Sequence, residues 1–297
     1  MRPDSKILAT LGHNISKRKN HLVGFNFWKS KKGCPKGTVP IQRTQMMNNQ
    51  RKYSRDGLSH LLKWNHGLDF AGIYSKPGQT FYGASGLINI YNPKLHGPNQ
   101  YSSVAIFLAS GKDLIEAGWT SDYYLSTGCY NALCPGFVVV NNEIPFGFVF
   151  NDTSVIERKQ YEEYFSIYLE PGVGWWLHVR DASVAIGYWP ISWFGTMQHS
   201  TTHLFFGGEV YTPLSDDESP QMGSGKFVDG QYDKTCYMRQ VSILNKDYQI
   251  VDVDNSYMAG YDSRCYYSGD NSFKNDVDRY SFVFGGRGGK DESTCVY

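Results

Sequence analysis

Short runs rich in β-branched and aromatic residues recur along this chain, and they constrain its fold more than any other feature. Each run has the length of a β-strand, and the turn-forming residues Gly, Pro, Asn and Asp gather between the runs. Helical periodicity is rare, which favours an antiparallel β-sandwich or barrel over alternating strands and helices. We therefore predict an all-β fold with strands at 87–91, 103–108, 137–140, 146–150, 164–169, 175–179, 184–189, 203–206, 237–244 and 280–284.

The run at 164–169 also predicts which of its side chains face the core. Successive side chains of a strand point to opposite faces, so Phe165, Ile167 and Leu169 share one face and should belong to the core. The tyrosines at 164 and 168 share the other face, where they either pack against a second layer or line a substrate groove. Packing is the interpretation we favour.

Charge and hydropathy exclude several classes of partner. The formal net charge is only +1, whereas proteins that bind nucleic acid or anionic membranes usually carry a basic surplus. No stretch approaches the roughly 18 to 20 apolar residues of a membrane span. The residues from Met1 to Ser5 lead into no apolar run of signal-peptide length. We expect a monomer that binds neither nucleic acid nor membrane.

The first part of the chain differs from the rest in composition. Basic clusters at 17–19, 29–32 and 51–52 stand in a region with little strand-like alternation. This region, residues 1–58, is either a flexible basic tail or a pro-segment that is cleaved near the basic residues before Asp56. The main domain is then residues 59–297.

The spacing of two cysteines favours a disulfide, given an oxidising compartment. Cys129 and Cys134 enclose four residues, a spacing that fits a short-loop disulfide better than a zinc site. Two sequons for N-glycosylation, which begin at Asn14 and Asn151, are compatible with secretion.

The commonest hydrolytic chemistries lack their motifs. No Gly-x-Ser-x-Gly motif is present, and no signature of a cysteine protease surrounds a thiol. His199 and His203 have the spacing of two zinc ligands but lack the glutamate of the usual motif, so we expect no metal and no cofactor. The chemistry that remains is that of two carboxyl groups in one partly buried site. Like charges close together cannot both ionise, so the two pKa values separate, and one group stays protonated while the other is a base.

Several segments in order resemble the carboxyl-terminal domain of the plant neprosin family. They include Ile-Glu-Ala-Gly-Trp at 115–119, Thr-Gly-Cys-Tyr-Asn-Ala-Leu-Cys at 127–134, Gly-Tyr-Trp-Pro at 187–190 and Gly-Gly-Glu-Val at 207–210. Further matches are 82–89, 221–225 and 284–288, and residues 1–5 and 34–43 resemble the latter part of the family's activation peptide.

The resemblance implies an antiparallel β-sandwich, preceded by a partial pro-segment, that acts as a secreted, acid-active glutamic endopeptidase cleaving near proline. Its polypeptide substrate would be proline-rich. The two catalytic glutamates of the family correspond to Glu116 and Glu209, which lie among glycines and apolar residues.

The resemblance further implies disulfides that join Cys129 to Cys134 and Cys265 to Cys295. Cys34 and Cys236 stay unassigned.

One departure from the family pattern lies beside Glu116. Family members carry a longer stretch between the tryptophan and the Thr-Gly-Cys motif, whereas only residues 120–126 intervene here. The shortfall corresponds to about one strand of five to six residues with its turn, and its loss would expose a sheet edge. The alternative function is therefore an inactive sandwich that binds a wall polysaccharide or a proline-rich polypeptide. Its binding surface could include Trp175, Trp176, Trp189 and Trp193, although core packing is the interpretation that we favour for these side chains.

Overall fold

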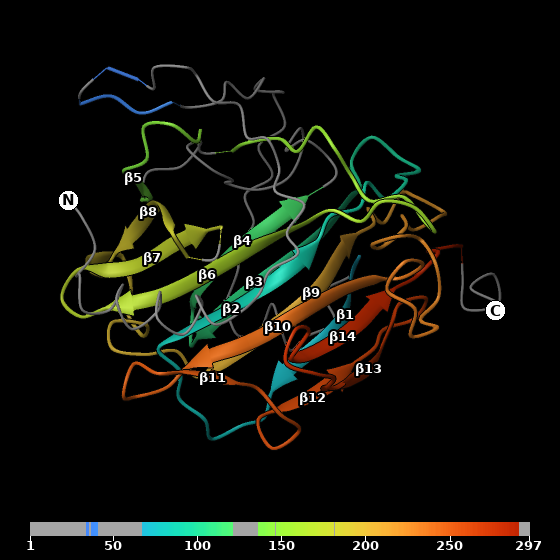
Figure 1. Cartoon of the computed structure of the whole chain (residues 1–297). Helices are drawn as coiled ribbons and strands as arrows, with labels where there is room; N and C mark the ends of the chain where they lie inside the picture. The colour runs from blue at the N-terminus through green and yellow to red at the C-terminus, as the bar shows by residue number, and fades with distance from the viewer. Residues whose placement is uncertain are drawn as a thin grey trace.

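Two antiparallel β-sheets form the molecule (Figure 1). The computed structural model describes residues 34–35, 37–40, 67–120, 136–145, 147–180 and 182–290, without the side chains of residues 119 and 120. Within these residues, the one helical element with assigned bounds is the short 3₁₀ turn η2 (Ile191–Trp193). None of the described residues form a helix long and apolar enough to cross a membrane.

The smaller sheet has five strands in the order β12-β1-β9-β3-β4. Its strands are β1 (Leu68–Ser75), β3 (Tyr101–Ser110), β4 (Asp113–Thr120), β9 (His203–Tyr211) and β12 (Met258–Tyr261). Every neighbouring pair is antiparallel. Because β1 and β9 lie far apart in the sequence, this sheet is held together by long-range pairing.

The larger sheet has nine strands, with the order β13-β14-β10-β2-β6-β7-β8-β5 and with β11 paired to β10. Its strands are β2 (Gly83–Asn89), β5 (Val138–Val139), β6 (Glu162–Glu170), β7 (Gly174–Val179), β8 (Val184–Pro190), β10 (Cys236–Leu244), β11 (Ile250–Asp252), β13 (Tyr267–Phe273) and β14 (Tyr280–Gly285).

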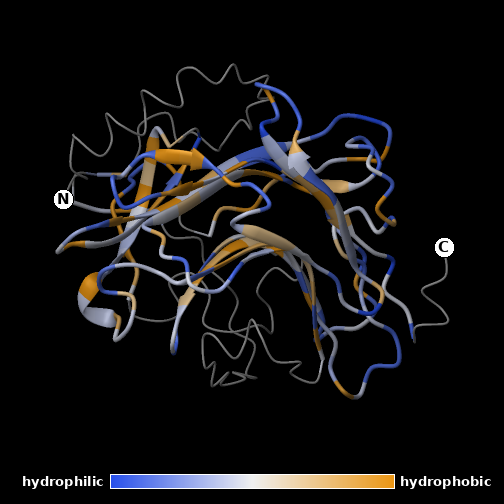
Figure 2. Cartoon of the chain, turned by 90° about the horizontal axis from the view of Figure 1, so that it is seen from below, coloured by the Kyte–Doolittle hydropathy of each residue, from blue (hydrophilic) through white to orange (hydrophobic). Residues whose placement is uncertain are grey.

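The main hydrophobic core lies between the two sheets. Val104, Ile106 and Leu108 of β3 belong to the same buried cluster as Phe165 and Ile167 of β6. Figure 2 shows the two arched layers of strands, one above the other. Burial of apolar side chains from both sheets, worth about 25 cal/mol per Å² of apolar surface, is the main force that holds the layers together.

The predicted all-β sandwich is confirmed, and so is the inward face of β6. Leu169 lies in the main core beside Phe165 and Ile167. Tyr164 and Tyr168 pack in smaller clusters on the opposite face of the sheet, where each is about 1% exposed. The tyrosines therefore serve packing, as the favoured interpretation holds.

Two strand predictions need correction. The described residues 147–150 of the run at 146–150 form no strand, because Gly147 takes a positive φ of 81° and the N–H of Phe148 donates to the carbonyl of Pro145 in a turn. In the run at 137–140, only Val138 and Val139 are assigned to a strand, β5, which pairs with β8. The strands β1, β4, β11, β12 and β13 were not among the predicted runs.

Candidate active site on the five-stranded sheet

The five-stranded sheet has a second face that points away from the main core. On β3 the core residues are Val104, Ile106 and Leu108, so the alternate residues Ser103, Ala105 and Phe107 point to the other side. We call this side the outer face. The strand register places the following residues on it as well: Phe70, Gly72 and Tyr74 of β1, Phe205, Gly207, Glu209 and Tyr211 of β9, Tyr101 of β3, and Glu116 and Gly118 of β4.

Glu209 lies in the middle of the outer face. It is opposite Phe70 of β1 on one side and opposite Ser103 of β3 on the other. The side chain of Glu209 is 0% exposed. A carboxyl group so far from water is costly to ionise unless hydrogen bonds or charges compensate for the lost hydration.

Glu116 reaches the same face from the other side of β3. It is opposite Phe107, and Phe107 is opposite Phe205 of β9. Ser103 and Phe107 are four positions apart along one strand, an even offset, so Glu116 and Glu209 point to the same side of the sheet. Glu116 is partly exposed, in contrast to Glu209. The structure thus places both glutamates on one face, one on each strand that flanks β3.

The floor between the two glutamates carries no large side chain. The row of cross-strand neighbours that separates them consists of Gly118, Ala105 and Gly207. A Cβ atom on Gly118 would lie 2.0 Å from the backbone oxygen of Val104, and Gly207 has a φ of 153°. Larger residues are therefore excluded at both glycine positions.

The spacing of the two carboxyls follows from the register. Two strand spacings of about 4.8 Å and four residues at about 3.3 Å each separate the two Cα atoms by about 16 Å. Strand side chains stand roughly perpendicular to the sheet, so the carboxyls are about 16 Å apart when both side chains are upright. Because each side chain can bring its carboxyl carbon about 4 Å closer, about 8 Å is the closest approach that the register allows.

Tyr101 contacts Glu209 directly. Its phenol O–H donates a hydrogen bond to Oε1 of Glu209. Nearby, the hydroxyl of Ser103 is 3.4 Å from the backbone oxygen of Glu209, to which it donates. Sequence reasoning missed Tyr101, although the alternation of β3 puts it on the same face as Ser103 and Ala105.

Aromatic rings surround the glutamates on the outer face. Phe70, Phe107 and Phe205 form a mutual edge-to-face cluster, with ring centroids 5.5 to 6.4 Å apart. Tyr101 stacks on Tyr211 with centroids 5.7 Å apart and an interplanar angle of 22°. These contacts give the carboxyls an apolar surround that lowers the local dielectric and strengthens polar interactions.

A turn after β12 fixes the strand that carries Phe70. The hydroxyl of Ser263 accepts from the N–H of Phe70 at 2.9 Å and donates to its carbonyl at 2.7 Å. Arg264 forms a bidentate ion pair with the buried Asp69. Cys265, the next residue, is disulfide-bonded, and its pairing with Cys295 remains a prediction because Cys295 lies outside the described residues.

The described residues include only some of the other cysteines and glycosylation sites that the sequence singled out. Cys129, Cys134 and Asn14 lie outside the described residues. Cys34 and Cys236 are free thiols. Asn151 is exposed at a bend, which leaves its sequon sterically accessible.

The two histidines that were considered as metal ligands lie at the start of β9. His203 begins the strand and His199 is exposed before it. Among the described residues, no group of three or more His, Cys, Asp or Glu side chains is arranged to hold a metal ion.

The tryptophan surface of the alternative function does not form. Trp175 and Trp176 are both 0% exposed, because Trp175 points into the main core and Trp176 packs against Tyr168 on the opposite side of β7. Only Trp193 is largely exposed, at 58%. The four residues therefore do not line one groove.

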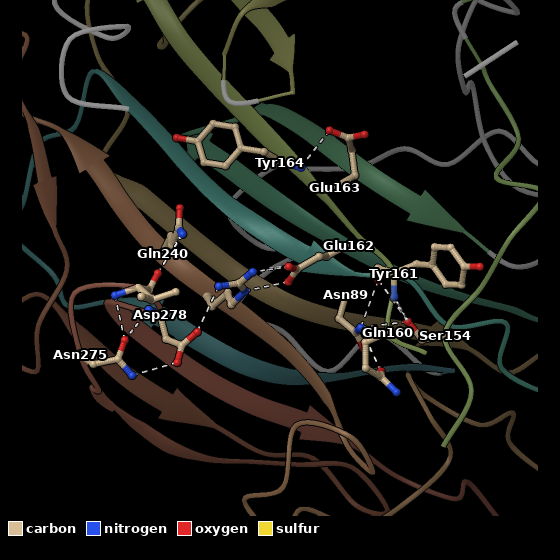
Figure 3. Close-up of polar contacts among 12 residues, drawn as sticks. Asn89, Ser154, Gln160, Tyr161, Glu162, Glu163, Tyr164, Gln240, Asn275 and Asp278 are labelled. Carbon is tan, nitrogen blue, oxygen red and sulfur yellow. Dashed lines mark hydrogen bonds and ion pairs between the residues drawn. The ribbon is translucent and has the colours of Figure 1, made fainter. Parts of the chain in front are cut away.

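A second cluster of buried charge lies in the nine-stranded sheet (Figure 3). Arg239 of β10 holds Glu162 of β6 through two of its guanidinium nitrogens and contacts Asp278 through the third, at 3.1 Å. A guanidinium that engages both oxygens of Glu162 neutralises the carboxylate and occupies it. This cluster serves stability, whereas the outer face of the five-stranded sheet is the better candidate for water activation.

The comparison with known families finds a match that includes the strands of the candidate site. The family model described as Neprosin matches residues 99–287, nearly two thirds of the chain. The match begins just before β3 and ends after β14, so it includes Tyr101, Glu116 and Glu209.

Proposed function

This chain belongs to the neprosin family, a family of peptidases that is extracellular in general, and we propose that it hydrolyses peptide bonds with Glu116 and Glu209 as its catalytic pair. The observation that supports the proposal is the placement of both carboxyls on one face of the sheet, across a floor of glycine and alanine. The row between the two carboxyls carries no side chain larger than the methyl group of Ala105.

In the proposed reaction, one glutamate is ionised and the other is protonated. The ionised carboxylate takes a proton from water as the water oxygen attacks the carbonyl carbon of the substrate. The protonated partner donates a hydrogen bond to the carbonyl oxygen, and a proton then passes to the amide nitrogen as the C–N bond breaks. The products are a carboxylic acid and an amine, and the reaction consumes one water.

This chemistry requires acidic conditions. At a pH well above the ordinary pKa of a carboxyl group, both glutamates are deprotonated. No acid then remains to protonate the leaving nitrogen. Both are protonated at very low pH, and the base is then lost. Activity is therefore confined to a window in which the two groups differ in protonation.

The preference for proline is proposed from membership of the family, and the aromatic cluster contributes the apolar surround of the two carboxyls. The rings of Phe70, Phe107 and Phe205 line the outer face between β1 and β3. At most 6% of each residue is exposed, so the cluster excludes water from one side of the site. The proposed substrate is a polypeptide that places proline next to the cleaved bond.

The proposal includes secretion and maturation of the chain. Residues 1–58 act as an activation segment whose removal frees residues 59–297 as the peptidase domain. The proposal includes attachment of a glycan at the exposed Asn151. Both features are testable by sizing the secreted protein before and after acidification.

The decisive test uses the whole chain, secreted from a host cell and then acidified. Cleavage of a proline-containing fluorogenic peptide is measured for the wild type and for the variants Glu116→Gln and Glu209→Gln. Each variant keeps the size of the side chain but removes the ionisable group, so each is expected to lower kcat by at least about 1,000-fold. The variant Glu143→Gln changes an exposed glutamate outside both sheets and serves as the matched control. Cleavage that survives in both active-site variants would reject the pair.

One observation favours an inactive binding protein as the second candidate. In the strand order of the described residues, β4 ends the five-stranded sheet and pairs with β3 alone. An end strand is less constrained than a central one, and β4 carries Glu116. If acidified wild type cleaves no peptide but is retained on a proline-rich polypeptide or on a wall polysaccharide, this second function is supported.

A further inference from the structure

The contact between Tyr101 and Glu209 joins two groups that both lie away from water. Tyr101 and Glu209 are each 0% exposed, and the phenol donates to Oε1 of the carboxyl. The residues belong to neighbouring strands and are 108 positions apart in the sequence. The contact therefore exists because β3 pairs with β9, and it does not arise from residues that are neighbours in the sequence.

The position of the phenol is fixed from two sides. Tyr101 is opposite Tyr211 in the register of β3 and β9, and the two rings stack. Such stacking restrains the ring of Tyr101, whose backbone lies one cross-strand row away from Glu209, and holds its hydroxyl against the carboxyl. A rigid donor orients a carboxyl better than a mobile one, because less entropy is lost when the hydrogen bond forms.

The hydrogen bond also biases protonation. A donor that points at a carboxyl oxygen stabilises the ionised form more than the neutral form, since charge-assisted hydrogen bonds are the stronger ones. Burial acts in the opposite direction. Tyr101 thus offsets part of the cost of ionising a carboxyl that is 0% exposed.

We propose that Tyr101 is the positioning residue of Glu209, which orients the carboxyl through Oε1 and keeps its ionised form within reach at acidic pH. The inference rests on the proposed function, because it assigns a role within the same site. It adds a residue that would not itself touch the substrate and would act through Glu209.

The other ionisable groups near Glu209 are defined by the register. The groups that share the outer face are Tyr74 of β1, His203 and Tyr211 of β9, Glu116 of β4 and Tyr261 of β12. At acidic pH the tyrosines are neutral, and His203 is at the far end of β9 from Glu209. Among the strand residues that the structure describes, Glu116 is therefore the second carboxyl group on this face.

The test is Tyr101→Phe in the full, acid-activated chain, with kcat and KM measured against pH. Phenylalanine keeps the ring that stacks on Tyr211 and removes only the hydroxyl. The matched control is Tyr280→Phe, which removes another buried hydroxyl, one that donates to Asn255 at 2.9 Å in the nine-stranded sheet.

The expected result has two parts. In Tyr101→Phe, kcat falls about tenfold to a hundredfold with KM nearly unchanged, since one hydrogen bond to a charged group is lost. One limb of the pH profile moves upward by about one pH unit while the other stays in place. In Tyr280→Phe, both limbs keep their positions.

Two results would overturn the assignment. An unshifted profile would show that the hydroxyl does not act on an essential carboxyl, and equal losses in both tyrosine variants would show a purely structural role. The outcome is separable from the proposed function. If Glu209→Gln abolishes cleavage while Tyr101→Phe behaves as wild type, the function stands and the positioning role falls.

Discussion

His178 makes the stability of this protein depend on pH in a direction that can be calculated. Its ring lies on β7 and is about 1% exposed. Nδ1 donates to the carbonyl of Ala182 at 2.8 Å, so Nε2 is the acceptor for the hydroxyl of Tyr168 at 3.1 Å. Burial lowers the pKa of His178 from 6.5 to about 4, although the hydrogen bond to Ala182 opposes that change.

The sign follows from proton linkage. Below pH 6.5 the unfolded chain binds a proton at this histidine, whereas the folded chain does not until the pH reaches about 4. The contribution of His178 to the free energy of unfolding is therefore fully present at neutral pH and declines as the pH falls. The decline is about 1.4 kcal/mol per pH unit, or about 3 kcal/mol over this window.

The perturbation that isolates this contribution is His178→Gln, because glutamine retains a donor and an acceptor but does not titrate. Urea unfolding is followed by tryptophan fluorescence at pH 7.5, 5.5 and 4, in the Glu209→Gln background so that self-digestion cannot interfere. The difference in unfolding free energy between the proteins without and with the His178→Gln substitution should shrink by about 3 kcal/mol from pH 7.5 to pH 4. Other carboxyls titrate in both proteins and cancel in the difference. A difference that stays constant with pH would refute the reasoning.

Three further perturbations have defined outcomes. Glu162→Gln removes the charge of one partner of the buried Arg239 and should lower the free energy of unfolding by about 3 to 5 kcal/mol. Calorimetry would detect this as a fall in Tm of about 10 °C, and a fall below about 2 °C would contradict this role. Ala105→Leu places a branched side chain on the floor between the glutamates and should lower kcat/KM by about a hundredfold or more, at a cost in stability of about 1 to 3 kcal/mol; wild-type kinetics would show that substrate does not cross this floor. Burial raises the pKa of the Cys236 thiol well above its usual range, so iodoacetamide should label Cys34 in the native protein and Cys236 only after unfolding, as read by mass spectrometry; equal labelling of both in the native state would contradict the burial.

Local pattern was sufficient to predict the fold class. The alternation at 164–169 identified the core side of β6, because the positions of the apolar residues within one strand are enough to show which of its faces is buried. The pattern failed at 146–150, where a positive φ at Gly147 and a turn at Phe148 override β-propensity. It also missed β13, whose residues Tyr-Ser-Gly-Asp-Asn-Ser-Phe are mostly polar and pair along β14.

The site required information that no single strand contains. Family resemblance selected Glu116 and Glu209, but their common face depends on the registers of β3 with β4 and with β9. A shift of one residue in either register would turn one glutamate toward the main core. Tyr101 was missed for the same reason, since its partner is on another strand.

The pH dependence of kcat/KM in the acid-activated wild type is the most direct test of the central claim, which is that two carboxyls on one face act in opposite protonation states. Rates with a proline-containing peptide are measured from about pH 2.5 to pH 8. The expected profile is a bell whose two limbs both lie in the acidic range, one for each glutamate. A single limb with a plateau that extends through neutral pH would contradict the claim, because at that pH neither carboxyl retains the proton that the leaving nitrogen needs.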